Sequence, residues 1–210
     1  MKFEHLAGAV IHDLKNQLQA LLDYEQEAIA HIPKRYHHHL EPILQRTNRL
    51  KNDTLQMVSL FRLEQNSSFP MDDAWPRDTA ADAIESTQLQ FPTIRFHNEI
   101  ADDCQGFYNE SLLNMALITL ITNSAQAGAT HIYIRADDSQ GLTLCVEDNG
   151  HGFEDSVLSG EKDTTKNEGT GMGLFFVDMI AKTHKQGEET GQVTRGNLPD
   201  GGASVCIHLP

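Results

Sequence analysis

His12, Asp13 and Asn16 are the first side chains along the chain whose spacing could support a reaction. At ~100° per residue on a helix, His12 projects roughly opposite an apolar stripe, with Asn16 beside it. A solvent-facing neutral imidazole can act as a nucleophile, and an adjacent carboxylate can orient the ring and take up its other proton. The helical projection therefore predicts that His12 faces solvent, a position that an ordinary polar surface residue would also occupy.

Asp148 is the centre of a second candidate site, because it ends a strand-like segment and is followed by Gly150 and Gly152. A buried carboxylate can select adenine, since it accepts a hydrogen bond from the adenine amino group, where guanine has a carbonyl. Glycines let the backbone come close to the base. The same segment also fits an ordinary turn, since Asp, Asn and Gly all favour turns.

Three closely spaced glycines, Gly169, Gly171 and Gly173, run directly into an apolar helical segment. Such glycines expose backbone N–H groups at the positive end of the helix dipole, which suits a polyphosphate. The segment lacks the ending of a P-loop and the glycine spacing of a Rossmann fingerprint. Residues 154–168 before it are polar, and they fit either a lid over a nucleotide or a solvated loop.

Taken together, these segments resemble the motifs of two-component histidine kinases. Residues 12–16 resemble the phosphoacceptor box, and residues 120–127 (LITNSAQA) resemble the N-box of the ATP-binding fold shared by gyrase, Hsp90, histidine kinases and MutL. Residues 147–153 and 169–174 match the G1 and G2 boxes of that fold. The motifs occur in the family's order over nearly the whole chain. The N-box with Gln at position 126 resembles that of the nitrogen-regulation branch of sensor kinases.

The resemblance implies a kinase that phosphorylates its own His12 from Mg-ATP, with Asp13 as the partner of the imidazole. It also implies transfer of the phosphoryl group to the aspartate of a response regulator. Asn16 would then position a water for dephosphorylation of that regulator. Gln17 is the competitor for this role, and we favour Asn16 because the helical projection turns Gln17 toward the apolar stripe.

For the nucleotide, the resemblance implies that Asn123 is the Mg²⁺ ligand, since an Asn carbonyl is a suitable hard oxygen donor. Many kinases carry Lys or Arg where Gln126 stands, so one phosphate contact is absent here. The ATP-binding residues implied by the motifs are Asn123, Asp148, Gly150, Gly152, Gly169, Gly171 and Gly173.

Helical periodicity dominates the first third of the chain. Apolar residues at spacings of three and four predict a helix over residues 3–31, which Pro33 ends. A second periodic stretch over residues 40–63 completes an antiparallel hairpin. A lone hairpin cannot bury both apolar stripes, so we expect a homodimer with a four-helix bundle.

The composition changes after the hairpin, so we expect a hairpin domain over 1–65, a linker over 66–77 and an ATP-binding domain over 78–210. The fold class is α+β: the hairpin is followed by an α/β sandwich, with one sheet covered on one face by helices. In that sandwich we expect helices at 79–90, 110–127 and 171–184, and strands at 94–99, 131–136, 142–147 and 203–209.

The charge and composition exclude several classes of protein. The formal net charge of −14 and the absence of a basic run argue against nucleic-acid binding. The apolar windows are too short to insert in a membrane and the N-terminus lacks a signal-peptide pattern, so we expect a cytoplasmic location. The three cysteines, Cys104, Cys145 and Cys206, are expected to be reduced apolar fillers. No sensor region precedes the hairpin, so a truncated chain or a kinase served by a separate sensor protein is expected.

Two alternatives use the same motifs. An ATP-hydrolysing machine of the gyrase and Hsp90 type has a Glu one turn before the metal Asn, where this chain has Thr119. A hydroxyl is a poor general base, which favours phosphoryl transfer. A histidine phosphotransfer relay that has lost ATP binding should show damaged glycine boxes, and both boxes are intact. Residues 37–39 are three consecutive histidines, which point in different directions on a helix and predict no metal site.

Overall fold

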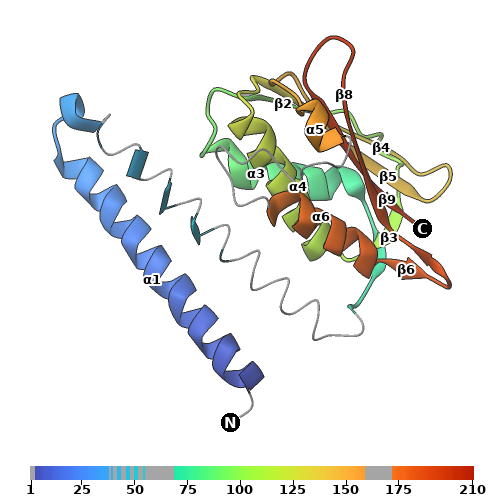
Figure 1. Cartoon of the computed structure of the whole chain (residues 1–210), viewed down its shortest axis with the longest axis horizontal. Helices are drawn as coiled ribbons and strands as arrows, with labels where there is room; N and C mark the ends of the chain where they lie inside the picture. Colours follow the sequence, from blue (N-terminus) through green and yellow to red (C-terminus); the bar gives the residue numbers. More distant parts are fainter. Residues whose placement is uncertain are drawn as a thin grey trace. The chain divides into compact units, whose positions relative to one another are not determined.

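The computed structural model describes residues 3–37, 39, 42–43, 46–47, 50–51, 54, 69–158 and 172–210. The chain divides into two compact units, Met1–Gln65 and Asn66–Pro210 (Figure 1). In the described part of the chain, no helix is both long and apolar enough to span a bilayer.

The first unit is built on helix α1 (Phe3–His31), whose bounds are those predicted from the periodicity. Leu18 and Leu22 of its apolar stripe are buried. The helix ends before Pro33, because a proline disfavours helical backbone in the residue that precedes it. A short 3-10 turn, η1 (Lys34–Tyr36), follows.

A second helical arm packs against α1. The described residues from 37 to 54 beyond the turn are helical. The Thr47 hydroxyl donates to Glu25 Oε1 at 2.8 Å, and Lys51 Nζ donates to Gln19 Oε1 at 2.8 Å. The midpoint in sequence is residue 36 for the first pair and residue 35 for the second, and both lie in η1. A common midpoint of this kind is what two antiparallel arms joined by one turn require. The predicted hairpin is confirmed over this part, and the remainder of its second arm lies outside the described residues.

The second unit contains a five-stranded mixed sheet in the order β2-β4-β5-β9-β8. The strands are β2 (Arg95–Asn98), β4 (His131–Asp137), β5 (Leu142–Asp148), β9 (Ala203–Leu209) and β8 (Gln192–Asn197). Strands β2 and β4 are parallel, and the other neighbours are antiparallel. Burial alternates along β5 and β9, so one face of the sheet is in the core and the other is more open.

Three helices cover the buried face of the sheet. Helix α4 (Glu110–Gln126) contacts both α3 (Pro76–Gln88) and α6 (Met172–Thr183), and Figure 1 shows the three side by side. The amphipathic sequence thus forms the predicted α/β sandwich. Fully buried side chains at the centre of this core are Leu113, Leu117, Ile121, Ile132, Ile134, Leu144, Phe176, Ile180 and Ile207.

Several short elements escape the periodicity analysis. Strand β1 (Asp72–Ala74) pairs with β3 (Gly106–Tyr108), although it lies in the predicted linker. Its sequence, two aspartates and an alanine, has no apolar alternation, so only the pairing with a distant segment makes it a strand. The β6 (Lys185–Gln186) and β7 (Glu189–Thr190) hairpin, helix α5 (Asp155–Leu158) and strand β8 were likewise not predicted.

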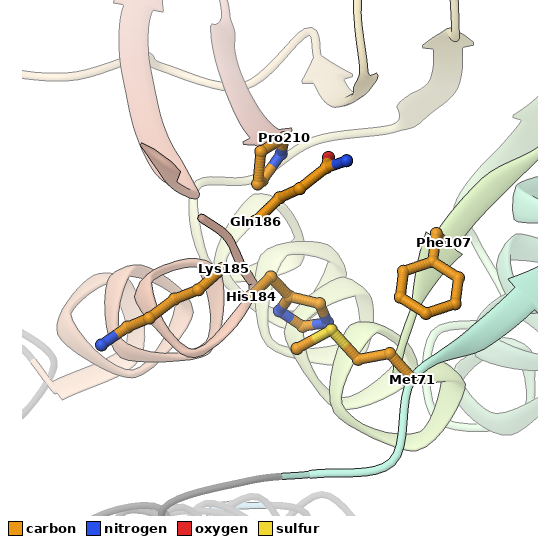
Figure 2. A pocket seen from close by; sticks show the side chains of 6 residues that line it. All are labelled: Met71, Phe107, His184, Lys185, Gln186 and Pro210. Carbon is orange, nitrogen blue, oxygen red and sulfur yellow. The ribbon is translucent and has the colours of Figure 1, made fainter. Parts of the chain in front are cut away.

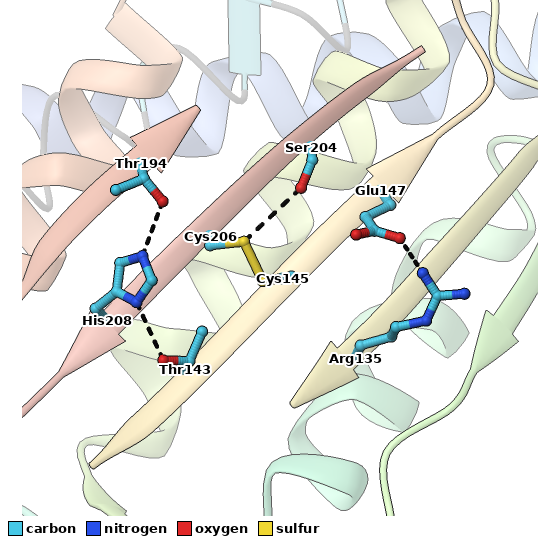
Figure 3. The surroundings of a disulfide bond; sticks show 8 residues. All are labelled: Arg135, Thr143, Cys145, Glu147, Thr194, Ser204, Cys206 and His208. Carbon is cyan, nitrogen blue, oxygen red and sulfur yellow. Dashed lines mark hydrogen bonds and ion pairs between the residues drawn. A yellow bond between two sulfur atoms is a disulfide. The ribbon is translucent and has the colours of Figure 1, made fainter. Parts of the chain in front are cut away.

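The prediction of three reduced cysteines is wrong for two of them. Cys145 on β5 and Cys206 on β9 form a disulfide bond (Figure 3). Cys104, in contrast, is free and buried. The two bonded residues are direct partners in the β5–β9 register. Sequence spacing could not reveal this pair, because 61 residues separate them and only the sheet order makes their strands neighbours.

His184 connects two of the helices from a buried position. It follows α6, is 1% exposed and lines a cavity of about 90 Å³ with Met71 and Phe107 (Figure 2). Its Nδ1 lies 2.8 Å from the Ile180 carbonyl oxygen, and its Nε2 accepts the Asn109 N–H at 3.1 Å. This arrangement requires the neutral ring with its proton on Nδ1.

We expect His184 to make the second unit less stable in mild acid. Burial lowers the pKa of His184 below its ordinary value of 6.5, although the bond to Ile180 opposes the shift. The unfolded chain therefore binds the proton more readily than the folded chain does. The contribution of neutral His184 to the free energy of unfolding is complete above about pH 6.5, and it is lost as the pH falls from there toward the pKa of the folded state. Urea unfolding followed by Trp75 fluorescence should show this loss in the wild type and a shallower pH dependence in His184→Gln. His151→Gln, at an exposed position, is the control and should keep the pH dependence of the wild type. The expectation would be contradicted if the unfolding free energies of wild type and His184→Gln changed with pH in the same way.

Candidate functional site

The Asp148 carboxylate is buried at the end of β5, where it is 5% exposed. Its Oδ2 accepts the Ser124 hydroxyl at 2.7 Å, and its Oδ1 accepts the Gly150 N–H at 2.8 Å. The Ala203 N–H, at 3.4 Å from Oδ1, approaches from the start of β9. The carboxylate is thus held in one orientation by three donors from three segments of the chain.

Two glycines allow the chain to pack closely around this carboxylate. A Cβ on Gly150 would lie 2.7 Å from the Ala127 carbonyl oxygen and 3.0 Å from Asp148 Oδ1. Gly202, at a φ of 96°, leaves no room for a side chain, because a Cβ there would overlap the carbonyl oxygen of Asp148. Gly150 was predicted from the sequence as part of the site, whereas Gly202 was not.

Two asparagines fix the loop that follows Asp148. Asn149 Oδ1 accepts the backbone N–H groups of Thr130 at 2.8 Å and His131 at 2.9 Å. Asn197 Oδ1 accepts the Phe153 N–H at 2.7 Å, and its Nδ2 donates to the Phe153 carbonyl at 2.9 Å. Gly152 lies in the loop between these two attachments. The loop is therefore tied to β4 at one end and to β8 at the other.

Asn123 and Gly173 come together where α4 meets the first turn of α6. A Cβ on Gly173 would lie 3.2 Å from both the Oδ1 and the Nδ2 of Asn123. Thr119 lies in the same place, since its Cγ2 would be 3.3 Å from that Cβ. Its hydroxyl donates to the Met115 carbonyl at 2.8 Å. The N-box and the end of the G2 box thus form one site, while Gly169 and Gly171 lie outside the described residues.

The phosphoacceptor segment belongs to α1 in the first unit. His12 and Asp13 lie on this helix, and their side chains are outside the described part of the structure. Asn16 and Gln17 are both exposed. Burial in this chain therefore does not distinguish the two residues, and the choice of Asn16 over Gln17 stays a prediction.

The side-chain and backbone groups at this site are suitable for binding Mg-ATP. An Asn side-chain oxygen at position 123 is a ligand type that Mg²⁺ accepts, with phosphates and water filling the other positions. Asp148 Oδ2 has one hydrogen-bonded donor, and a carboxylate oxygen has two lone pairs, so it can also accept an amino group. The α6 N-terminus beside Asn123 offers backbone N–H groups to phosphate.

Ser124, Asn197 and Gly202 are the site residues that the sequence analysis missed. Ser124 directly follows Asn123 in the N-box, and its position about 100° further around the helix could have placed its hydroxyl toward the sheet. Asn197 has no such local signal, because it reaches Phe153 from 44 residues away.

Several known proteins are similar to this chain in sequence. Residues 108–210 match the family described as histidine kinase-, DNA gyrase B-, and HSP90-like ATPase. The tetrathionate sensor histidine kinase TtrS of Salmonella typhimurium strain LT2 is 28% identical over 97% of this chain and 37% of its own length. The signal transduction histidine-protein kinase AtoS of Escherichia coli strain K12 is 25% identical over 98% of this chain and 34% of its own length. This chain thus spans about a third of the length of these relatives.

A solved structure supports the fold of the second unit. The ATP binding domain of PrrB from Mycobacterium tuberculosis superimposes with a TM-score of 0.55 at 22% identity. The match covers 67% of this chain and 96% of that domain. The similarity to the nitrogen-regulation branch stays a prediction, since none of these matches tests it.

Proposed function

This chain belongs to the sensor histidine kinases that have a gyrase B- and HSP90-like ATPase domain, and we propose that it phosphorylates its own His12 from Mg-ATP. The observation that carries the proposal is the buried Asp148 carboxylate, oriented by Ser124 and Gly150. A fixed acceptor at the rim of a glycine-lined loop is what recognition of an adenine amino group requires.

Four features of the second unit are assigned roles in nucleotide binding: Asp148, the loop after it, Asn123 and the glycines before α6. Asp148 accepts the adenine amino group, and the loop held by Asn149 and Asn197 borders the base. Asn123 would hold Mg²⁺, which when bound supplies neutralisation of phosphate charge. Gly173, together with Gly169 and Gly171 as the resemblance implies, opens the helix N-terminus to the phosphates.

The first unit supplies the nucleophile. A neutral ring nitrogen of His12 attacks the γ-phosphorus while the bond from that phosphorus to the ADP oxygen breaks. Asp13 takes up the proton from the other ring nitrogen as positive charge develops on the imidazole. A response regulator then accepts the phosphoryl group on its own aspartate. Asn16, with Gln17 as its competitor, positions water when the regulator is dephosphorylated.

The alternatives make different demands on the same residues. An ATPase needs a base for water near Asn123, and the Thr119 hydroxyl is both a weak base and already a donor to Met115. A relay without ATP needs no oriented adenine acceptor. We therefore favour the kinase, which works in the cytoplasm, where ATP is supplied, and receives its signal from a sensor region or a separate sensor protein.

Incubation with γ-labelled ATP and Mg²⁺ tests the proposal. The expected product is a labelled chain whose label is labile in acid and stable in alkali, as a phosphoramidate should be. Release of labelled phosphate without a labelled chain would favour the ATPase. Acceptance of phosphate from a phosphorylated regulator by a chain that does not label itself would favour the relay.

The exposed apolar side chains of the first unit support the proposed homodimer. Leu21 is 46% and Tyr24 is 70% exposed on α1, and Ile43 and Leu50 are exposed on the second arm. We expect a solution mass of twice 23.4 kDa at micromolar concentration.

Leu21→Glu should weaken this dimer by on the order of 100-fold, because burial of an unpaired carboxylate costs several kcal/mol. Ala20→Glu, a change at the adjacent exposed position, should have little effect and serves as the control. Light scattering over a concentration series measures both. A wild-type chain that is monomeric throughout would contradict the dimer.

A further inference from the structure

The disulfide between Cys145 and Cys206 lies on the face of the sheet that the helices do not cover. The two residues lie opposite each other on the neighbouring strands β5 and β9 (Figure 3). Six consecutive residue pairs join these strands. Their Cα atoms are 4.0 Å apart, near the ~4.5 Å of a non-hydrogen-bonded pair in an antiparallel sheet. The strand pairing therefore holds the two sulfur atoms together whether or not they are bonded. Both residues are partly exposed, so a small reagent can reach them.

The chemistry of this pair follows from the compartment in which ATP is used. Thiol buffers there keep cysteines reduced, and the disulfides that do form are usually transient. One cysteine thiolate attacks a small-molecule disulfide and expels one thiol, which leaves a mixed disulfide. The second cysteine then attacks the protein sulfur of that bond and expels the other thiol. The protein pair loses two electrons and two protons, and the small disulfide becomes two thiols.

The same two strands meet again at the candidate nucleotide site. Asp148 is three residues beyond Cys145 on β5, and Ala203 is three residues before Cys206 on β9. The Ala203 N–H lies 3.4 Å from Asp148 Oδ1, the long end of the hydrogen-bond range, and Gly202 packs against the Asp148 backbone. The disulfide limits how far β5 and β9 can separate at Cys145 and Cys206. It therefore also limits their separation three residues away, where the Asp148 carboxylate is held.

We propose that Cys145 and Cys206 form a reversible thiol–disulfide site that takes a low-molecular-weight disulfide as its oxidant. In the oxidised form, the site around Asp148 is more rigid and binds nucleotide more tightly, because less ordering remains to be done on binding. The effect on nucleotide rests on the proposed function, whereas the thiol chemistry and the rigidity do not.

The test uses the full chain with Cys104→Ser, which removes the remaining thiol. Cys104 is a poor competitor in any case, since burial, followed by the nearby aspartates, raises the pKa of its thiol. Oxidised glutathione should convert the pair to one intramolecular disulfide, and reduced glutathione should reverse it, as measured by thiol trapping and mass spectrometry. Amide hydrogen exchange at Gly150 and Ala203 should be slower in the oxidised form. Affinity for ATP should be about threefold higher.

A variant with Cys145→Ser and Cys206→Ser in the same background should behave as the reduced form in either glutathione mixture. A pair that does not oxidise, a bond that glutathione cannot reduce in the folded chain, or equal amide exchange in the two forms would overturn the proposal. Equal or weaker ATP binding in the oxidised form would also overturn it. If neither form binds ATP, the proposed kinase function fails, and the trapping and exchange results still decide the redox site.

Discussion

His12→Gln is expected to lower self-phosphorylation from γ-labelled ATP by on the order of 1,000-fold or more, to the background of the assay. Gln lacks a nucleophilic ring nitrogen, so no step can replace attack on the γ-phosphorus. ATP binding should stay within about twofold of wild type, because the Asp148 site belongs to the other compact unit. The measurement is the amount of acid-labile label per chain, with ATP affinity determined in parallel.

His31→Gln is the matched control for this change. It makes the same substitution at an exposed position of the same helix, where the ring contacts only the Glu27 carbonyl among the hydrogen bonds described. It should label as the wild type does. Label that persists in His12→Gln would remove this residue from its assigned role, and equal loss in both variants would indicate damage to the helix.

Asp148→Asn should weaken ATP binding by on the order of 100-fold, since the amide nitrogen would face the adenine amino group donor to donor. The substitution keeps the shape of the side chain, and the remaining oxygen can still accept the Gly150 N–H. Because an amide nitrogen can donate to the carbonyl of guanine, the preference for ATP over GTP should also fall. Titration calorimetry with both nucleotides measures the two effects.

Asp82→Asn, on an exposed position of α3, is the control for this change. It should bind ATP as the wild type does. Thermal unfolding of both variants separates loss of binding from loss of fold. ATP affinity in Asp148→Asn within about threefold of wild type would contradict the role of this carboxylate in base recognition.

The elements with strong periodicity could be predicted from the sequence. Helix α1 has the predicted bounds, and strands β5 and β9 lie within a residue of theirs, because side-chain spacing within one element records which face is buried. Strand β1 could not be predicted in this way, since it is defined only by its pairing with β3. The same holds for β8, whose exposed face carries polar side chains.

The types of the candidate site residues were also present in the sequence. Asp148, Asn123 and the glycines are recognisable from motif order alone, and the structure brings Asn123 against Gly173 and Gly150 against Asp148. The hydrogen bonds that hold these residues in place could not be recognised in the sequence. Ser124 reaches Asp148 across 24 residues and Asn197 reaches Phe153 across 44, and neither contact has a period that sequence spacing could reveal.

By itself, therefore, the sequence determined the described part of the helical hairpin, the α/β character of the second unit and the chemical groups of the candidate site, because these depend on residue type and local spacing. The tertiary structure alone decided that β9 lies between β5 and β8. That order brings Ala203 and Gly202 to Asp148, aligns Cys145 with Cys206, and carries Asn197 to the loop after Asp148. The strand order arises because the apolar faces of several helices and strands must be buried together. The sequence of one segment does not contain this information.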